Sequence, residues 1–214
     1  MNTNRLLLFG LIIVAVVMGW RLYQQKHADT GQLAASLRGK TLIVAWTGRV
    51  ELPMHTLLAR AFDKWRSRSE QILLQLNSPG GSLREGGDVI ELLQRIKHTH
   101  KLDTYVASAA ICMSMCVPIF LQGDNRIAAP DARFMFHEPK RYFDDGSEAK
   151  GFSFEREALT RRFFNKYFVN SPMDAQWRGQ LEKDWIGKDI FMSGAQLLED
   201  GSNIVTRLEY PPGQ

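Results

Sequence analysis

Apolar and polar positions follow two different periods along the chain from Thr41 onward. Short apolar runs at residues 41–46 and 71–76 end in turn-forming residues, which is typical of buried strands. Between them, apolar residues recur at helical spacing over residues 54–65 and predict an amphipathic helix. A second amphipathic helix is predicted to begin at Ser82, where Ser-Leu-Arg-Glu fits a capping box.

The rest of the chain continues this alternation of strands and helices. The further predicted elements are a strand at 103–108, short strands near Ile127 and Phe134, and a helix from about Phe154 to Phe168. Such an order implies right-handed crossovers, a largely parallel sheet and helices outside it, which is an α/β fold. Ligands bind these sheets at the carboxyl ends of strands, so chemistry is expected at the turn 77–81 and after Ser108.

An uncharged apolar run, Leu6–Trp20, precedes this pattern. It is short for a transmembrane helix, which needs about 17–25 residues. Arg5 and Arg21 can snorkel, however, which makes a span over residues 6–22 feasible. A cleaved signal peptide is the competing interpretation, but the bulky residues at 20–23 lack a small-x-small cleavage pattern. We therefore expect a retained N-terminal hydrophobic helix.

The sequence divides into three parts. Residues 1–23 are predicted as a transmembrane anchor or uncleaved signal segment, 24–40 as a polar linker with a short helix around Leu33–Leu37, and 41–210 as one domain. The composition, with 44% hydrophobic and 23% charged residues, is that of an ordinary globular protein. The net charge of +4 is small and spread along the chain, which argues against a nucleic-acid partner.

Three local patterns carry candidate chemistry. Gly80-Gly81 lies between a strand and a capped helix, where unobstructed N–H groups favour an oxyanion, although a plain tight turn also explains the glycines. Ser114 lies between a strand and a stretch at 117–121 that looks helical, and its two candidate roles are nucleophile and helix N-cap. His137 ends an apolar strand, and an imidazole base is what activates a serine.

Taken in order, these motifs resemble the Clp protease proteolytic subunit family of the ClpP/crotonase superfamily. The matching stretches are Leu76–Ser82, Ser114-Met115, Arg126–Pro139 and Lys188–Ser193. The resemblance covers about Leu42 to Val205, which is nearly the whole predicted domain. It implies a repeated β-β-α spiral core with a largely parallel sheet.

The resemblance also assigns roles residue by residue. Ser114 matches the nucleophile, His137 the general base and Asp189 the carboxylate that orients the imidazole. The backbone N–H groups of Gly81 and Met115 match the oxyanion hole. The resemblance thus implies a complete Ser-His-Asp triad.

The chain departs from the family pattern around the serine. Cys116 stands where the family has a glycine, and Met113 is bulky where the family has a small residue. Cys112 and Cys116 flank Ser114, and their spacing is within reach of a disulfide that would brace the turn and imply an oxidising compartment. Two buried thiols and a cysteine nucleophile are the other interpretations.

These features predict a membrane-tethered serine hydrolase, in particular a peptidase that acts on a peptide or protein substrate without cofactor or metal. A single-pass anchor is expected to hold the hydrolase domain on the periplasmic or extracytoplasmic side. Asp184 and Glu138 are alternative acids, although neither matches the motif as Asp189 does. Two other functions stay open, namely a catalytically inactive scaffold or binding protein and an acyl-CoA enzyme of the crotonase type.

Two expectations concern protein partners. The helix at 158–169 has more aromatic residues than one buried face requires, and the matching helix of the family mediates self-association, so a homo-oligomer is expected. An ATPase partner is not implied, because the N-terminal apolar segment stands where the family has its axial loops.

Overall fold

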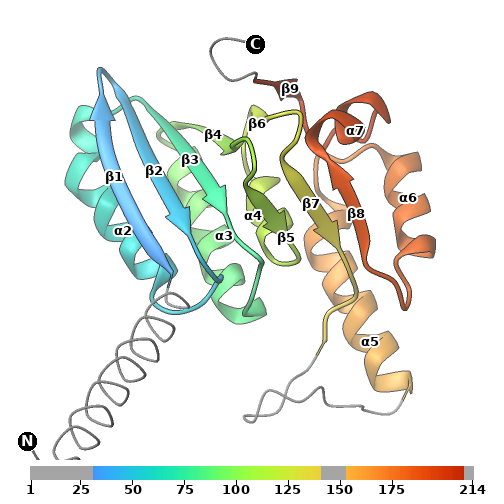
Figure 1. The fold of residues 1–214 in the computed structure, drawn as a ribbon. Helices are drawn as coiled ribbons and strands as arrows, with labels where there is room; N and C mark the ends of the chain where they lie inside the picture. The colour runs from blue at the N-terminus through green and yellow to red at the C-terminus, as the bar shows by residue number, and fades with distance from the viewer. Residues whose placement is uncertain (1–30, 141–152, 210–214) are drawn as a thin grey trace, which may run out of the picture.

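Two β-sheets form the frame of the fold in the computed structural model, which describes residues 31–140 and 153–209 (Figure 1). The larger sheet has the order β1-β2-β3-β4-β6-β9, and its strands are Gln32–Arg38, Thr41–Thr47, Gln71–Asn77, Lys101–Val106, Arg126–Ala128 and Arg207–Leu208. All neighbours pair in parallel except β1, which is antiparallel to β2. The prediction of a largely parallel sheet is therefore confirmed.

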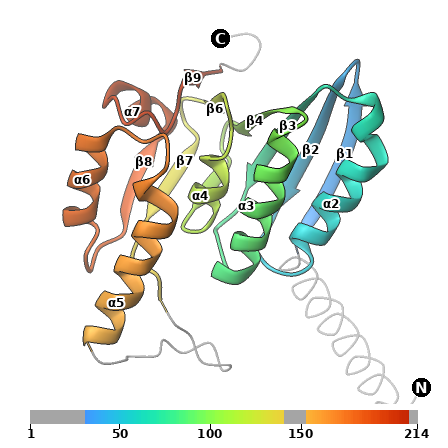
Figure 2. The same cartoon turned by 180° about the vertical axis from the view of Figure 1, so that it is seen from behind.

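Two long helices cover one face of this sheet. Helices α2 (Met54–Trp65) and α3 (Leu83–Lys97) lie behind the strands in Figure 1 and in front of them in Figure 2. The apolar stripe predicted α2 with its observed bounds, and its inward residues Met54 and Leu58 join the core. The strands β2 and β3 alternate buried and half-buried positions, because successive side chains of a strand point to opposite faces and the helices cover one of them.

The capping box predicted at the start of α3 is only half present. The Ser82 hydroxyl accepts the N–H of Glu85 at 3.2 Å, as an N-cap does. The reciprocal bond is absent from the described residues, because the Ser82 N–H donates to Val50 and the Glu85 carboxylate binds His55 instead. The contact with α2, which the local motif does not show, redirects the glutamate.

The smaller sheet lies beside the larger one and has the order β5-β7-β8, with strands Ile111–Met113, Arg133–Phe136 and Ile190–Ser193. Strands β5 and β7 are parallel, and β8 is antiparallel to β7. Two successive units, β4-β5-α4 and β6-β7-α5, each place one strand in each sheet before a helix. This is the expected β-β-α repeat, and it brings the ends of β5, β7 and β8 together.

The predicted linker 24–40 is wrong over its described part. Residues Gln32–Arg38 form β1, which pairs with β2 along its whole length, so the domain begins about ten residues earlier than expected. Leu33 and Leu37 suggested a short helix, but residues four apart share a face in a strand as well as in a helix. Both side chains pack against the core from β1. The turn at Gly39, with a φ of 58°, closes a two-residue hairpin.

The aromatic helix also differs from its prediction. It runs as α5 (Ser153–Phe164) and continues as the π-helical turn η2 (Asn165–Val169). Phe163, Phe164 and Phe168 are buried and surround the buried Trp185 of the same chain. Self-association was expected because the helix has more aromatic residues than one buried face requires. These rings instead fill the protein's own core, so they no longer support that expectation.

The remaining described elements complete the second half of the fold. They are η1 (Arg66–Arg68), α4 (Cys116–Phe120), α6 (Ala175–Asp184) and α7 (Gly194–Glu199). Within the described ranges, no helix has the length and apolar character to cross a membrane. The predicted span 6–22 lies outside the described residues.

Candidate active site

Ser114 lies in the turn between β5 and α4. Its φ of 52° is in the left-handed region, which costs a residue with a side chain roughly 1–2 kcal/mol. Its N–H donates to the carbonyl of Met135 at 2.9 Å, which holds the turn against β7. The N-cap of α4 is Met115, so the interpretation of Ser114 as a helix cap is wrong. A strained polar residue at a strand-to-helix turn is instead a candidate nucleophile.

His137 directly follows β7, the parallel neighbour of β5. Met113 at the end of β5 lies opposite Met135 of β7, so the residues just beyond both strands lie side by side. The Nε2 atom of His137 is 2.7 Å from the Oγ atom of Ser114. An imidazole at this distance is placed to take the hydroxyl proton. Sheet register therefore brings together two residues that are 23 positions apart.

Asp189 approaches the other side of the same imidazole. It precedes β8, whose first residue Ile190 pairs with Phe136 of β7, so Asp189 and His137 are the next positions along this antiparallel pair. The Nδ1 atom of His137 is 3.8 Å from the Oδ1 atom of Asp189. That distance is within ion-pair range and longer than a hydrogen bond. The Asp189 side chain is about half exposed, at 49%, whereas that of His137 is at 16%.

The two alternative acids are engaged elsewhere. One oxygen of Glu138 accepts the Thr160 hydroxyl at 3.0 Å, and the other accepts the N–H of Gly187 at 2.7 Å. Glu138 thereby ties α5 to the loop that leads into Asp189, a positioning role that the sequence did not reveal. Asp184 accepts from the Gln180 side chain within α6.

The glycine segment after β3, Gly80-Gly81, packs against the turn that carries Ser114. Val50 donates to the carbonyl of Gly80 and accepts from Ser82, which fixes one side of the segment. A Cβ on Gly80, whose φ is 89°, would stand 2.6 Å from the Met113 carbonyl and 2.7 Å from the Ser114 Cβ. Only glycine allows the segment to come this close to the serine turn. A tight turn alone therefore does not explain why residue 80 is glycine.

Two backbone amides border the serine. Among the described residues, the N–H groups of Gly81 and Met115 donate to no backbone or side-chain acceptor. The Met115 nitrogen is 3.0 Å from where a Cβ of Gly80 would stand, so it lies at the contact of the glycine segment with the serine turn. Amides without an internal acceptor beside a nucleophile are the groups that bind a developing oxyanion.

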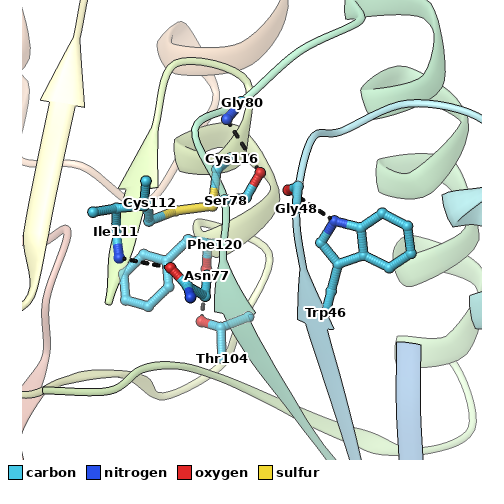
Figure 3. Close-up of a disulfide and its surroundings, with 10 residues drawn as sticks. All are labelled: Trp46, Gly48, Asn77, Ser78, Gly80, Thr104, Ile111, Cys112, Cys116 and Phe120. Atoms are coloured by element: carbon cyan, nitrogen blue, oxygen red, sulfur yellow. Dashed lines mark hydrogen bonds between the residues drawn. A yellow bond between two sulfur atoms is a disulfide. The ribbon is translucent and has the colours of Figure 1, made fainter. Parts of the chain in front are cut away.

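Cys112 and Cys116 are joined in a disulfide whose Cα atoms are 5.2 Å apart (Figure 3). Cys112 lies within β5 and Cys116 is the first residue of α4, so the bond spans the turn that carries Ser114. Both residues are fully buried. The chain has only these two cysteines, and neither is a free thiol.

One group of side chains in the described ranges has the composition of a metal site. The ligand atoms of His55, Glu85 and Asp88 lie within 4.8 Å of one another. The Glu85 carboxylate is almost fully buried and already accepts the His55 backbone N–H at 2.7 Å and lies 2.9 Å from Nδ1 of the ring. Both contacts come from His55 of α2, so the group fits a clamp between α2 and α3.

The fold and these contacts define a class, namely a mixed α/β protein with a serine–histidine pair at the ends of parallel strands. A family model described as Clp protease matches residues 55–201, so the chain belongs to the Clp protease family. The matched stretch includes Ser114, His137 and Asp189.

Individual relatives are distant. Proteins described as ATP-dependent Clp protease proteolytic subunit match from Pinus thunbergii, at 27% identity over 60% of this chain, and from Streptococcus sanguinis, at 27% over 76%. The aligned part spans 63% of the Pinus thunbergii protein and 82% of the Streptococcus sanguinis protein. A relative from Chara vulgaris is 30% identical and is matched over 59% of its length. Several relatives are therefore matched over only about three-fifths of their length. A solved ClpP1 mutant from Listeria monocytogenes shares the fold, with a TM-score of 0.62, 18% identity, and coverage of 81% of this chain and 93% of that one.

Proposed function

We propose that the protein is a serine-type peptidase of the Clp protease family. One observation carries the proposal, namely the 2.7 Å contact between the Ser114 Oγ and the His137 Nε2 at a left-handed serine turn. In the proposed reaction, His137 takes the hydroxyl proton as Ser114 attacks a peptide carbonyl. The amides of Gly81 and Met115 then bind the oxyanion of the tetrahedral intermediate. The imidazolium returns its proton to the leaving amine.

Asp189 is proposed to orient the imidazole. Its position next to His137 in the β7–β8 register supports this role, and the 3.8 Å separation requires a small closure when substrate binds. The loop is tethered close by through the bond between Glu138 and Gly187, so a closure of this size needs only local adjustment. Catalytic hydrogen bonds are often long before substrate is bound.

The experiment that tests the reaction is labelling with a fluorophosphonate probe, which reacts with an activated serine. We expect covalent labelling at Ser114 and none in Ser114→Ala. His137→Gln is expected to lower the labelling rate by at least ~10³-fold, because the base is lost. If folded protein resists the probe, the chain is the non-catalytic scaffold of this fold. If Asp189→Asn labels at the rate of the wild type, the site is a Ser–His dyad.

We further propose that the domain is membrane-tethered on the extracytoplasmic side and that it self-associates, the latter supported only by its membership of the Clp protease family. The disulfide supports an oxidising compartment. Gly31 packs against Gly48 at the carboxyl end of β2, and the Gly48 N–H donates to the carbonyl of Asn77, so Gly31 is held at the end of the sheet that carries the site. Full-length protein is expected in the membrane fraction, and a chain lacking residues 1–23 in the supernatant. If the full-length protein and the shortened chain appear in the same fraction, the membrane tether is contradicted. A monomer in sedimentation would contradict self-association.

A further inference from the structure

Two backbone hydrogen bonds hold Ser114 in its turn. Its N–H is bonded to Met135, and its carbonyl accepts the N–H of Val117 at 3.0 Å. The next helical bond to the same carbonyl would come from position 118, which is proline and has no N–H. The left-handed conformation of Ser114 is therefore not secured by the regular pattern of α4.

The flanks of the turn are anchored separately. On the β5 side, the Ser78 N–H donates to the carbonyl of Ile111 and the Ser78 carbonyl accepts the N–H of Met113, so this strand is fixed to the segment after β3. On the α4 side, Val117 and the rest of the short helix are buried in the core. A bond that joins the two anchored flanks therefore fixes the path of the residues between them.

The disulfide makes this connection. It links the middle of β5 with the first residue of α4 and closes a loop that contains only Met113, Ser114 and Met115. We propose that Cys112 and Cys116 are positioning residues for the nucleophile, and that the oxidised bond holds Ser114 in its reactive conformation. This inference rests on the proposed function of Ser114, whose regulation it specifies.

The chemistry of the switch is thiol–disulfide exchange with a dithiol reductant. The dithiol supplies two electrons and two protons, the sulfur–sulfur bond becomes two thiols, and the reductant becomes a disulfide. Ser114 then relaxes toward an unstrained φ, which moves its hydroxyl away from His137 and shifts the Met115 N–H. The disulfide closes a very short loop. Breaking it therefore changes the entropy of the unfolded chain far less than breaking a disulfide that closes a long loop. The effect of reduction is local.

The test compares oxidised protein, protein reduced with dithiothreitol, and the Cys112→Ser/Cys116→Ser variant, all as the full chain. The chain has no other cysteine, so the variant is a matched control that must not respond to the reductant. We expect the fluorophosphonate labelling rate of Ser114 and kcat to fall on the order of 10²-fold on reduction and in the variant, the scale expected for a nucleophile misplaced by about 1 Å. KM is expected to stay within about twofold, and reoxidation to restore the reduced wild type.

A second measurement separates bracing from catalysis. Hydrogen exchange of residues 113–117 is expected to rise on reduction and in the variant, while exchange in α2 and α3 and the far-ultraviolet circular dichroism stay unchanged. Equal labelling rates in the folded oxidised and reduced states would overturn the inference and leave the proposed function standing. Loss of labelling that follows global unfolding would overturn it as well. If the oxidised protein does not label, the proposed function fails. In that case, hydrogen exchange at residues 113–117 that does not change on reduction would still refute the proposal that the disulfide holds the turn.

Discussion

Gly80→Ala is the substitution whose effect follows most directly from the structure. The new Cβ would stand 2.6 Å from the Met113 carbonyl oxygen and 2.7 Å from the Ser114 Cβ, whereas ordinary contacts are at 3.4–4 Å. Neither neighbour is the end of a flexible side chain, so the glycine segment and the serine turn must move apart. The substitution also puts a side chain at a φ of 89°.

Two contributions set the size of the effect. Left-handed strain costs about 1–2 kcal/mol, and overpacking at a tight contact costs typically about 1–3 kcal/mol. We therefore expect Gly80→Ala to lower the free energy of unfolding by about 2–5 kcal/mol. Gly39→Ala is the matched control, because Gly39 has a φ of 58° but nothing within 4 Å of its Cβ position. Gly39→Ala should lose only the strain, about 1–2 kcal/mol.

Urea unfolding followed by tryptophan fluorescence measures stability, and fluorophosphonate labelling measures the site. Under conditions in which both variants are folded, we expect Gly80→Ala to label on the order of 10²-fold more slowly than the wild type, because relieving these contacts displaces the serine turn by roughly 1 Å. Gly39→Ala should label normally. Equal destabilisation by the two substitutions, or normal labelling of Gly80→Ala, would refute the reasoning.

Two further predictions concern the frame around the site. His55→Ala is expected to lower the free energy of unfolding by about 2 kcal/mol, because the buried Glu85 carboxylate loses a charge-assisted partner; urea unfolding against exposed His98→Ala checks this, and equal values would contradict it. Burial alone would raise the pKa of Asp124, but the hydrogen bond from Lys97 and further favourable contacts outweigh it, and the net pKa is lowered. The resulting stability is present above the unfolded pKa of about 4 and lost as pH falls through the lower folded pKa. The stability gap between wild type and Asp124→Asn should therefore shrink from pH 6 to pH 2, and a constant gap would show that Asp124 contributes nothing through its charge.

Several elements were predictable because one local pattern explains them. The stripe over residues 54–65 has helical spacing and nothing competes with it, so α2 appears with the predicted bounds. The alternation of strands and helices likewise predicted the largely parallel sheet. β1 was missed because Leu33 and Leu37 are four residues apart, a spacing that fits both a helix and a strand. Only pairing with β2 decides between the two.

Glu85 and the aromatic rings show the limit of local patterns. A glutamate three residues after Ser82 predicts a capping box, yet it binds His55 of another helix. The aromatic residues of α5 and η2 suggested an exposed interface, yet Trp185, which is distant in the sequence, covers them. In both cases a tertiary partner satisfies the side chain, and no spacing along the chain reveals that partner.

For the serine site, the sequence alone supplied the order of the motifs and the residue types, because these are properties of short segments. The tertiary structure supplied the geometry. Parallel pairing of β5 with β7 puts Ser114 next to His137, and antiparallel pairing of β7 with β8 brings Asp189 to the other side of the ring. Register is fixed by which strand faces are buried, and burial depends on the whole chain. The strain at Ser114 and the disulfide that spans it are likewise three-dimensional facts, which the sequence left open.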